Sequence, residues 1–198
     1  MGKHSFFNRI SEEWDQHLKE KDFSSVQKML AHFSFSPHEK VLDVGAGTGI
    51  VYPYLRDLGV SDYQALEPSE GMARVFLKKH PEAKIRVVEF EEDDTPAACF
   101  DKIFIFNAFP HFKDFELVFQ KSYRALKATG ILVICHSMSR EELNAYHKKA
   151  SKVVAEDVLP AQDVMTSLFT NAGFVDVQIE NTNWYFASGS KAPFKEEV

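Results

Sequence analysis

The sequence predicts an α/β protein with a doubly wound, mostly parallel sheet. Short apolar runs rich in Val, Ile and Phe alternate along the chain with amphipathic stretches of helical period. A glycine-rich turn joins the first run to the first helix of this series in "VLDVGAGTGI", residues 41–50. Near the end, two runs that alternate apolar and polar residues flank "NTN" and predict an antiparallel hairpin at the sheet edge. Frequent alternation of strand and helix favours right-handed crossovers with helices on both faces of the sheet.

Size and charge limit the classes of protein to consider. The chain has 198 residues, 44% of them hydrophobic, which is enough for one core and hardly for two domains. Its net charge of -6 disfavours nucleic acid and anionic membranes as partners. Cys99 and Cys135 form no CxxC pair and suit a reducing, cytoplasmic location. Residues 1–30 are too charged for a signal peptide, and no run reaches membrane-spanning length.

Residues 5–35 predict two amphipathic helices that precede the sheet and must pack on something. The first helix repeats apolar residues at helical spacing, at Phe6, Phe7, Ile10, Trp14 and Leu18. The second does so at Phe23, Val26, Leu30 and Phe33. Such stripes are more typical of packing than of chemistry, although a helix over a ligand site would also exclude water.

Strands and helices alternate after residue 40. The predicted strands are 41–44, 62–68, 84–90, 100–109 and 130–137, and the predicted helices between them are 50–58, 69–80 and 114–130. Pro81 stops the second of these helices, and Gly130 ends the third. The last two strands are nearly continuous in apolar residues, as strands buried on both faces are.

The last part of the chain predicts two helices and the hairpin. Ser139 and Glu142 form a capping box, and the helix that it starts has an inner stripe at Leu143, His147, Ala150 and Val154. Residues 161–174 predict a helix that stops at Gly173, and the hairpin strands are 174–180 and 184–190. We expect the tail, residues 191–198, to be frayed.

The glycine-rich turn presents backbone N–H groups at the start of a helix. Gly45, Gly47 and Gly49 allow positive φ and close approach of a ligand. A dinucleotide site would read GxGxxG, but Ile50 stands where the third glycine should be. Asp43, beside the turn, would repel a pyrophosphate and suits a ligand that carries positive charge.

Glu67 closes the second predicted strand. A carboxylate there has two acceptor oxygens, which can take both hydroxyls of an adenosine ribose. The alternatives are a solvated strand end at Glu67 and a tight turn without a ligand at the glycines. The coincidence of the two features favours a nucleoside ligand, but it does not separate one nucleotide family from another.

Four motifs, taken in order, resemble the class I S-adenosylmethionine-dependent methyltransferases. They are "VLDVGAGTG", "ALEPSEGM" with Glu67, "FDKIFIFNAFPHF" and "YRALKATGILVICH", which lie within residues 40–137. Ala128 and Thr129 stand where this family usually has Pro-Gly. "FFNRISEEWD" also resembles the lid segment of the quinone-type and related small-molecule methyltransferases.

The resemblance implies a seven-stranded, Rossmann-like sheet whose last strand is antiparallel. It further implies a single methyltransferase domain over residues 1–198, divided into an N-terminal helical lid (1–38), a Rossmann-like core (39–190) and a tail (191–198). The implied cofactor, S-adenosylmethionine, has a sulfonium, an ammonium and a carboxylate but no phosphate. The turn's N–H groups suit its carboxylate, and nearby acids suit its cations.

The same resemblance implies a set of cofactor-binding residues: Asp43, Gly45, Ala46, Gly47, Glu67, Pro68, Met72, Glu89, Phe90 and Asn107. Asp43, Gly45 and Gly47 would line the methionine end, and Glu67 would hold the ribose. Glu89 and Phe90 would flank the adenine, and Asn107 would sit beside the methyl group. The family usually has an aspartate and a small residue at the adenine, so residues 91–94 stay as competing candidates.

Two histidines are candidate catalytic residues. His111 follows the fourth predicted strand, where the acceptor would sit, and a neutral imidazole can accept its proton, hydrogen-bond it or only order the loop. His136 ends the fifth strand, on the side where ligands bind in such sheets, although structural histidines are more common there.

Further polar residues extend this region. A polar acceptor pocket can be built from His136, His147, Arg140, Asn144 and Tyr146. A metal site formed by His111, His136, His147 and Asp157 lacks local ligand spacing, so we expect none.

We therefore expect methyl transfer to a small-molecule acceptor. A non-catalytic cofactor-binding module is the alternative. A nucleic acid methyltransferase is less favoured, because amino-group base methyltransferases carry Asp/Asn/Ser-Pro-Pro-aromatic where this chain has "NAFP". An NAD-dependent oxidoreductase is disfavoured by Ile50. The acceptor atom, any general base and the oligomeric state stay open.

Overall fold

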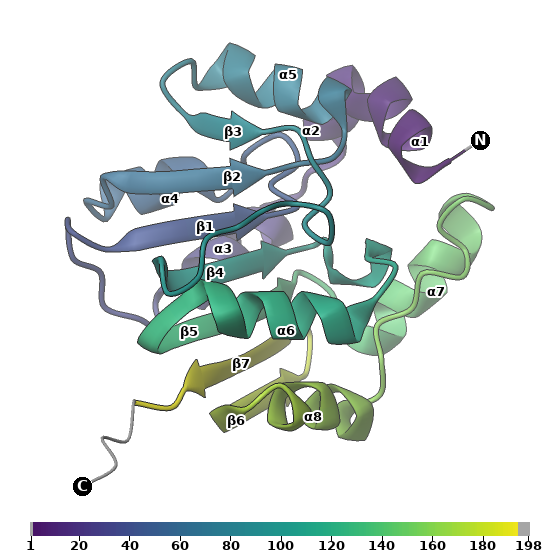
Figure 1. Cartoon of the computed structure of the whole chain (residues 1–198). Coiled ribbons are helices and arrows are strands. Elements are labelled where there is room, and N and C mark those ends of the chain that lie inside the picture. The colour runs from purple at the N-terminus through teal and green to yellow at the C-terminus, as the bar shows by residue number, and fades with distance from the viewer. Residues whose placement is uncertain (1, 194–198) are drawn as a thin grey trace, which may run out of the picture.

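In the computed structural model, which describes residues 2–193, one seven-stranded sheet runs through the protein in the order β3-β2-β1-β4-β5-β7-β6 (Figure 1). The strands are β1 Lys40–Val44, β2 Asp62–Leu66, β3 Lys84–Arg86, β4 Phe100–Phe106, β5 Leu126–His136, β6 Phe174–Asn181 and β7 Tyr185–Lys191. β7 pairs antiparallel with both β5 and β6, and the other neighbours pair parallel. The predicted fold class is confirmed, including the C-terminal hairpin at the sheet edge.

Helices cover both faces of this sheet. They are α1 Lys3–Ile10, η1 Ser11–Glu13, α2 Trp14–His17, α3 Glu20–Leu30, α4 Tyr52–Asp57, α5 Glu70–Lys79, η2 Phe109–His111, α6 Phe115–Ala125, α7 Arg140–Ala150 and α8 Gln162–Asn171. α6 and α8 pack on one face through Phe119 and Phe169. α3 and α4 pack on the other through residues such as Met29 and Leu55. The buried strands between the two layers are apolar on both sides.

Several element boundaries differ from the prediction, and two of the differences follow from how the strands pair. The third strand was expected over 84–90 but ends at Arg86, because its single sheet neighbour, β2, ends at Leu66. The helix expected over 114–130 ends at Ala125, and β5 begins at the next residue. An irregular register between β4 and β5 pairs Phe100 with Leu126 and so extends this strand toward its N-terminus.

The helix ends follow local sequence signals. Ser139 and Glu142 form the predicted capping box, since Oγ of Ser139 accepts the N–H of Glu142 over 3.2 Å and the Glu142 carboxylate accepts the N–H of Ser139 over 3.1 Å. Val154, predicted in the inner stripe of this helix, lies beyond its end but is still buried. The first N-terminal helix of the prediction is broken into α1, η1 and α2.

The carboxyl ends of β1, β2, β4 and β5 open toward the same edge of the sheet, where α1 and α7 lie in Figure 1. This edge collects the loops that carry the candidate site residues. Of the predicted tail, residues 194–198 lie outside the described residues, and β7 extends to Lys191. Within residues 2–193, the helices are all too short or too polar to cross a bilayer.

Candidate functional site

The glycine-rich turn after β1 is held in a left-handed backbone conformation. Gly45, Gly47 and Gly49 have φ values of +71°, +55° and +87°. A Cβ at Gly45 would lie 2.6 Å from Cβ of Ala108, and one at Gly49 would lie 2.6 Å from the ring of Phe76. A Cβ at Gly47 would meet nothing within 4 Å. Two of the glycines therefore permit close packing, whereas the third borders open space.

Glu67 ties the end of β2 to this turn. Its Oε2 accepts the N–H of Gly47 and its Oε1 accepts the N–H of Ser69, each over 2.8 Å. Burial raises the pKa of the Glu67 carboxyl to about 7, although both backbone donors oppose the rise. Each carboxylate oxygen has a second lone pair, so Glu67 retains acceptor capacity toward a ligand.

A cavity of about 510 Å³ extends from the glycine turn to the loop after β4. Its wall includes ten of the predicted site residues: Gly45, Ala46, Gly47, Glu67, Pro68, Met72, Glu89, Phe90, Asn107 and His111. These residues come from the ends of β1, β2 and β4, from the segment after β3 and from α5. The fold therefore brings together residues that are up to 66 positions apart in the sequence.

Asp43 is a predicted site residue that does not line this cavity. Strand residues alternate between the two sheet faces, and Asp43 lies under the turn, where its Oδ2 accepts the hydroxyl of Tyr63 over 2.6 Å. Its Oδ1 has no hydrogen-bond partner in the described structure. Burial raises the pKa of Asp43 to about 7, and the Tyr63 hydrogen bond opposes this rise.

His136 does not line the cavity either. It is buried at the end of β5, and neither ring nitrogen has a hydrogen-bond partner within residues 2–193. Its register partner in β7 is Tyr185, whose hydroxyl is also buried without a partner in that range. Burial lowers the pKa of His136 to about 3, so the ring is neutral in the folded protein.

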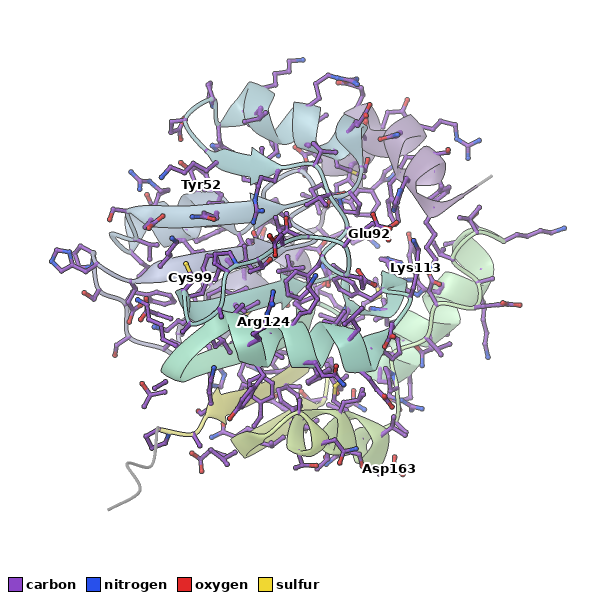
Figure 2. The ribbon with its side chains drawn as sticks, viewed as in Figure 1. Tyr52, Glu92, Cys99, Lys113, Arg124 and Asp163 are labelled. Carbon is purple, nitrogen blue, oxygen red and sulfur yellow. The ribbon has the colours of Figure 1, made fainter. Side chains whose placement is uncertain are left out.

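The segment after β3 forms one end of the cavity. Glu89 lies there between two basic side chains, with Nζ of Lys113 at 2.5 Å and Nε2 of His4 at 3.0 Å. Figure 2 labels Lys113 in the loop that leads to α6. Phe90 is buried beside Glu89. Of the competing acids at residues 91–94, only Glu91 lines the cavity.

Asn107 connects the ends of β4 and β5. It has a positive φ of 52°, and its N–H donates to the carbonyl of Cys135 over 2.8 Å. Its Oδ1 accepts the N–H of Ser137 over 2.9 Å. The hydroxyl of Ser137 in turn donates to Asp22 of α3. Asn107 is therefore fixed at the cavity wall by β5, by Ser137 just after β5 and, through Ser137, by α3.

The N-terminal helices close over the cavity. Their contribution to its wall is Lys3, His4, Ser5, Phe7, Trp14 and Leu18. Oδ1 of Asn8 accepts the hydroxyl of Ser69 and the N–H of Gly71, each over 2.8 Å, which docks α1 on the start of α5. Asp15 accepts hydrogen bonds from Thr48 over 2.5 Å and from Lys79 over 2.6 Å. The sequence pattern did not identify Asn8 or Asp15, because their partners lie far away along the chain.

His111 lies at the cavity wall within a polar cluster. Its Nδ1 is 2.8 Å from Oδ2 of Asp157, in the loop after α7. Lys3 of α1 lies 2.7 Å from the other oxygen of Asp157 and donates to the carbonyl of His111 over 3.1 Å. Nδ1 of His147 is 2.5 Å from the backbone carbonyl of Asp157. The described residues contain no cluster of three or more His, Cys, Asp or Glu side chains that fits a metal ion.

Two other residues of the predicted acceptor pocket, Arg140 and Asn144, anchor the loop after α7. Nε of Arg140 donates to the carbonyl of Pro160 over 3.0 Å. Asn144 exchanges two hydrogen bonds with the backbone of Leu159. Tyr146 is exposed on α7. These three side chains do not line the cavity. Arg140 and Asn144 hold the loop that carries Asp157.

This chain is similar in sequence to known methyltransferases. A family model described as a methyltransferase domain matches residues 42–134. An uncharacterized methyltransferase of Oceanobacillus iheyensis is 26% identical over 147 residues, which are 70% of this chain and 68% of that protein.

Two solved structures share the fold. One is a Thermotoga maritima S-adenosylmethionine-dependent methyltransferase, described as a possible histamine N-methyltransferase, with a TM-score of 0.75, 20% identity and coverage of 93% of this chain and 97% of that one. The other is Haemonchus contortus phosphoethanolamine N-methyltransferase 2 with phosphomonomethylethanolamine and S-adenosylhomocysteine, with a TM-score of 0.71 and 18% identity. That match covers 85% of this chain and 52% of the nematode chain, so this chain spans about half the length of that one.

Proposed function

The chain belongs to the class I S-adenosylmethionine-dependent methyltransferases, and from this premise we propose that its methyl acceptor is a small molecule. The observation that carries the proposal is the cavity of about 510 Å³ that the N-terminal helices help to line. This volume is in the range of small-molecule sites. Phe7, Trp14 and Leu18 form its outer wall, so an acceptor bound there would lie inside the protein.

The residues in the cavity fit the cofactor. The open space beside Gly47 would admit the amino-acid end of S-adenosylmethionine, and backbone N–H groups suit its carboxylate. We propose that Glu67, which is buried at the wall and has lone pairs to spare, holds the ribose hydroxyls. Glu89 and Phe90 would lie along the adenine, and Asn107 near the transferred methyl group.

Asp43 takes a different part in this proposal. It lies under the glycine turn rather than at the wall, and its unpartnered Oδ1 is buried. An acid beneath the turn still contributes negative potential to a site that binds a cation, to the extent that it is ionised. We therefore propose an indirect, electrostatic contribution of Asp43 to cofactor binding.

When it is bound, the cofactor supplies an electrophilic methyl group on a positively charged sulfur. The residues of this chain then have two tasks, which are to align the acceptor's lone pair with that methyl and to exclude water. Asn107 is fixed by backbone contacts to β5, which suits alignment. The apolar side chains of α1 and α2 cover the cavity and suit exclusion of water. We propose that residues 1–38 act as a lid of one domain.

A labelling experiment tests the acceptor class. The purified protein is incubated with S-adenosylmethionine carrying a radioactive methyl group and, separately, with a small-molecule extract, total RNA, DNA and a protein extract. We expect label in the small-molecule fraction only, and excess S-adenosylhomocysteine should abolish it. Label in RNA, DNA or protein would contradict the proposal. Calorimetric binding of S-adenosylmethionine without label in any fraction would instead support the non-catalytic alternative.

A further inference from the structure

Asp157 holds two different partners on its two carboxylate oxygens. Oδ1 pairs with Nζ of Lys3 at 2.7 Å, and Oδ2 pairs with Nδ1 of His111 at 2.8 Å. The side chain of Asp157 is only 9% exposed, whereas that of His111 is 22% exposed and reaches the cavity wall. Burial acts to raise the pKa of Asp157, but the hydrogen bonds from His111 and Lys3 bring it below its usual value. Asp157 is therefore an ionised acceptor for both partners.

This arrangement fixes which nitrogen of His111 carries the hydrogen. An ionised carboxylate can only accept, so Nδ1 of His111 must donate to it. In the neutral ring, Nε2 is then an acceptor with a free lone pair. Within residues 2–193, no hydrogen bond from protein to this Nε2 is found, and His111 lines the cavity.

The groups around His111 come from four elements. Lys3 lies on α1, Asp157 in the loop after α7, His147 on α7 and His136 at the end of β5. His147 donates from Nδ1 to the carbonyl of Asp157, and burial lowers the pKa of both His147 and His136. Asp157 is therefore the one acid in direct contact with the His111 ring within the described part of the chain.

We propose that His111 is the general base for the acceptor and that Asp157 and Lys3 are its positioning residues, so that the acceptor is a hydroxyl or an amine that must lose a proton. This inference rests on the proposed function. The lone pair of the acceptor oxygen or nitrogen forms a bond to the methyl carbon, while the carbon–sulfur bond breaks and its electron pair stays on sulfur. The acceptor's proton moves to Nε2 of His111 and then to solvent.

The lid takes part in this arrangement. Lys3 lies at the start of α1, and Figure 1 shows that start close to the loop after α7. Lys3 bridges the carboxylate of Asp157 and the carbonyl of His111. Phe7, one helical turn further on, places its ring edge-on to His111 with the ring centroids 5.1 Å apart. A docked lid therefore completes the support of the base and covers it at the same time.

The Asp157→Asn variant gives a sharp test, because an amide has one accepting and one donating end. The ammonium of Lys3 can only donate, so it selects the amide oxygen and leaves the NH₂ group facing His111. The neutral ring must then carry its hydrogen on Nε2. Long-range ¹H–¹⁵N spectra at pH 8, assigned with His111→Gln, report this tautomer directly. We expect the Nδ1–H form to dominate in the wild type and the Nε2–H form in Asp157→Asn.

Two further variants make the reasoning falsifiable. In the double variant Lys3→Met with Asp157→Asn, the amide is free to turn its oxygen to His111, so the Nδ1–H form should return. Asp163→Asn, an exposed control on α8 that Figure 2 labels, should change nothing. An Nε2–H form in the wild type, or an unchanged tautomer in Asp157→Asn, would overturn the proposal.

Turnover gives a second readout with a panel of phenols and primary amines as acceptors. We expect Asp157→Asn to lower the rate of methyl transfer by about 10²- to 10⁴-fold. Affinity for S-adenosylhomocysteine should stay within about twofold, because Asp157 is not part of the cofactor wall. An unchanged rate would refute the role of the base. If the wild type did not bind S-adenosylhomocysteine, this would instead refute the proposed function. The tautomer test would still be valid in that case.

Discussion

The N–H of Gly47 donates to Oε2 of Glu67 over 2.8 Å, so the acid at the end of β2 shapes the turn after β1. The N–H of Ser69 occupies the other oxygen. A group proposed to bind the ribose is thus also a structural part of the site. This double use has a consequence for mutagenesis, because substitution of Glu67 changes both the ligand contact and the backbone around it.

Glu67→Gln should weaken binding of S-adenosylmethionine and also lower stability. An amide has one accepting oxygen for the N–H groups of Gly47 and Ser69, so one donor loses its partner, at a cost of about 1–3 kcal/mol. Loss of the proposed charge-assisted hydrogen bonds to the ribose should reduce affinity by about ten- to a hundredfold. Calorimetry and urea unfolding measure the two effects. Glu70→Gln, exposed on the first turn of α5, is the matched control, and equal affinities in the two variants would contradict our assignment.

Alanine substitutions at three glycines with positive φ distinguish a role in packing from a role in ligand binding. Alanine at Gly59, φ +87° with nothing within 4 Å of its Cβ, should cost about 1–2 kcal/mol of stability from backbone strain alone. Gly45→Ala should cost more, because its Cβ meets Ala108 at 2.6 Å. Gly47→Ala should resemble Gly59→Ala in urea unfolding but lose cofactor affinity in calorimetry. Unchanged affinity in Gly47→Ala would show that the ligand does not approach this turn.

The buried acid Asp43 should make stability depend on pH. Burial raises its pKa from 3.8 to about 7, so the folded state holds a proton that the unfolded state releases above pH 4. Its contribution to the free energy of unfolding is therefore complete below pH 4 and is lost as pH rises through 7. The total is of order 4 kcal/mol. Glu67, whose pKa is also raised to about 7, acts in the same direction.

Asp43→Asn removes the titrating group and keeps an acceptor for Tyr63. In urea unfolding, the free energy of unfolding of this variant should fall between pH 5 and pH 8 by roughly half as much as that of the wild type. The decrease that is left comes from Glu67. The difference between variant and wild type should be largest at pH 8, in favour of the variant. Should the variant show the full wild-type decrease, Asp43 would be ionised across this range and our account of it would be wrong.

Asn8→Ala should loosen the lid while the sheet stays intact. The side chain of Asn8 accepts two hydrogen bonds from the start of α5, and its loss leaves the N–H of Gly71 without this partner. We expect amide exchange of residues 3–17 to accelerate about tenfold, with no change in β1 or β4. Asn171→Ala, at the exposed end of α8, is the control. Equal acceleration in lid and sheet would indicate global destabilisation instead.

Much of the fold was predictable because strand and helix periods are local. The apolar runs at β4 and β5 and the capping box at Ser139 gave reliable signals. The end of β3 was not predictable, since it depends on where β2 stops pairing. The boundary between α6 and β5 depends in the same way on the irregular pairing of Phe100 with Leu126.

The site residues show the same contrast between features that a local pattern predicts and features that depend on distant parts of the chain. Residues at strand ends reach the cavity because the carboxyl ends of parallel strands meet there, as for Gly47, Glu67 and Asn107. Strand alternation turns Asp43 away from the wall and toward Tyr63, which a motif alone does not reveal. Asp157 was identified by residue type, but its pairing with Lys3 joins segments 154 positions apart, and no local pattern contains it.

The insertion of β7 between β5 and β6 sets an order on biosynthesis. β6 has β7 as its sheet neighbour, and β7 is the last strand of the described chain, so a ribosome must deliver residues up to Lys191 before this half of the sheet can be sealed. Until then, the apolar edge of β5 stays open to other chains. Nascent protein should therefore rely on chaperones until β7 has been synthesised, and truncation before Tyr185 should send it toward aggregation.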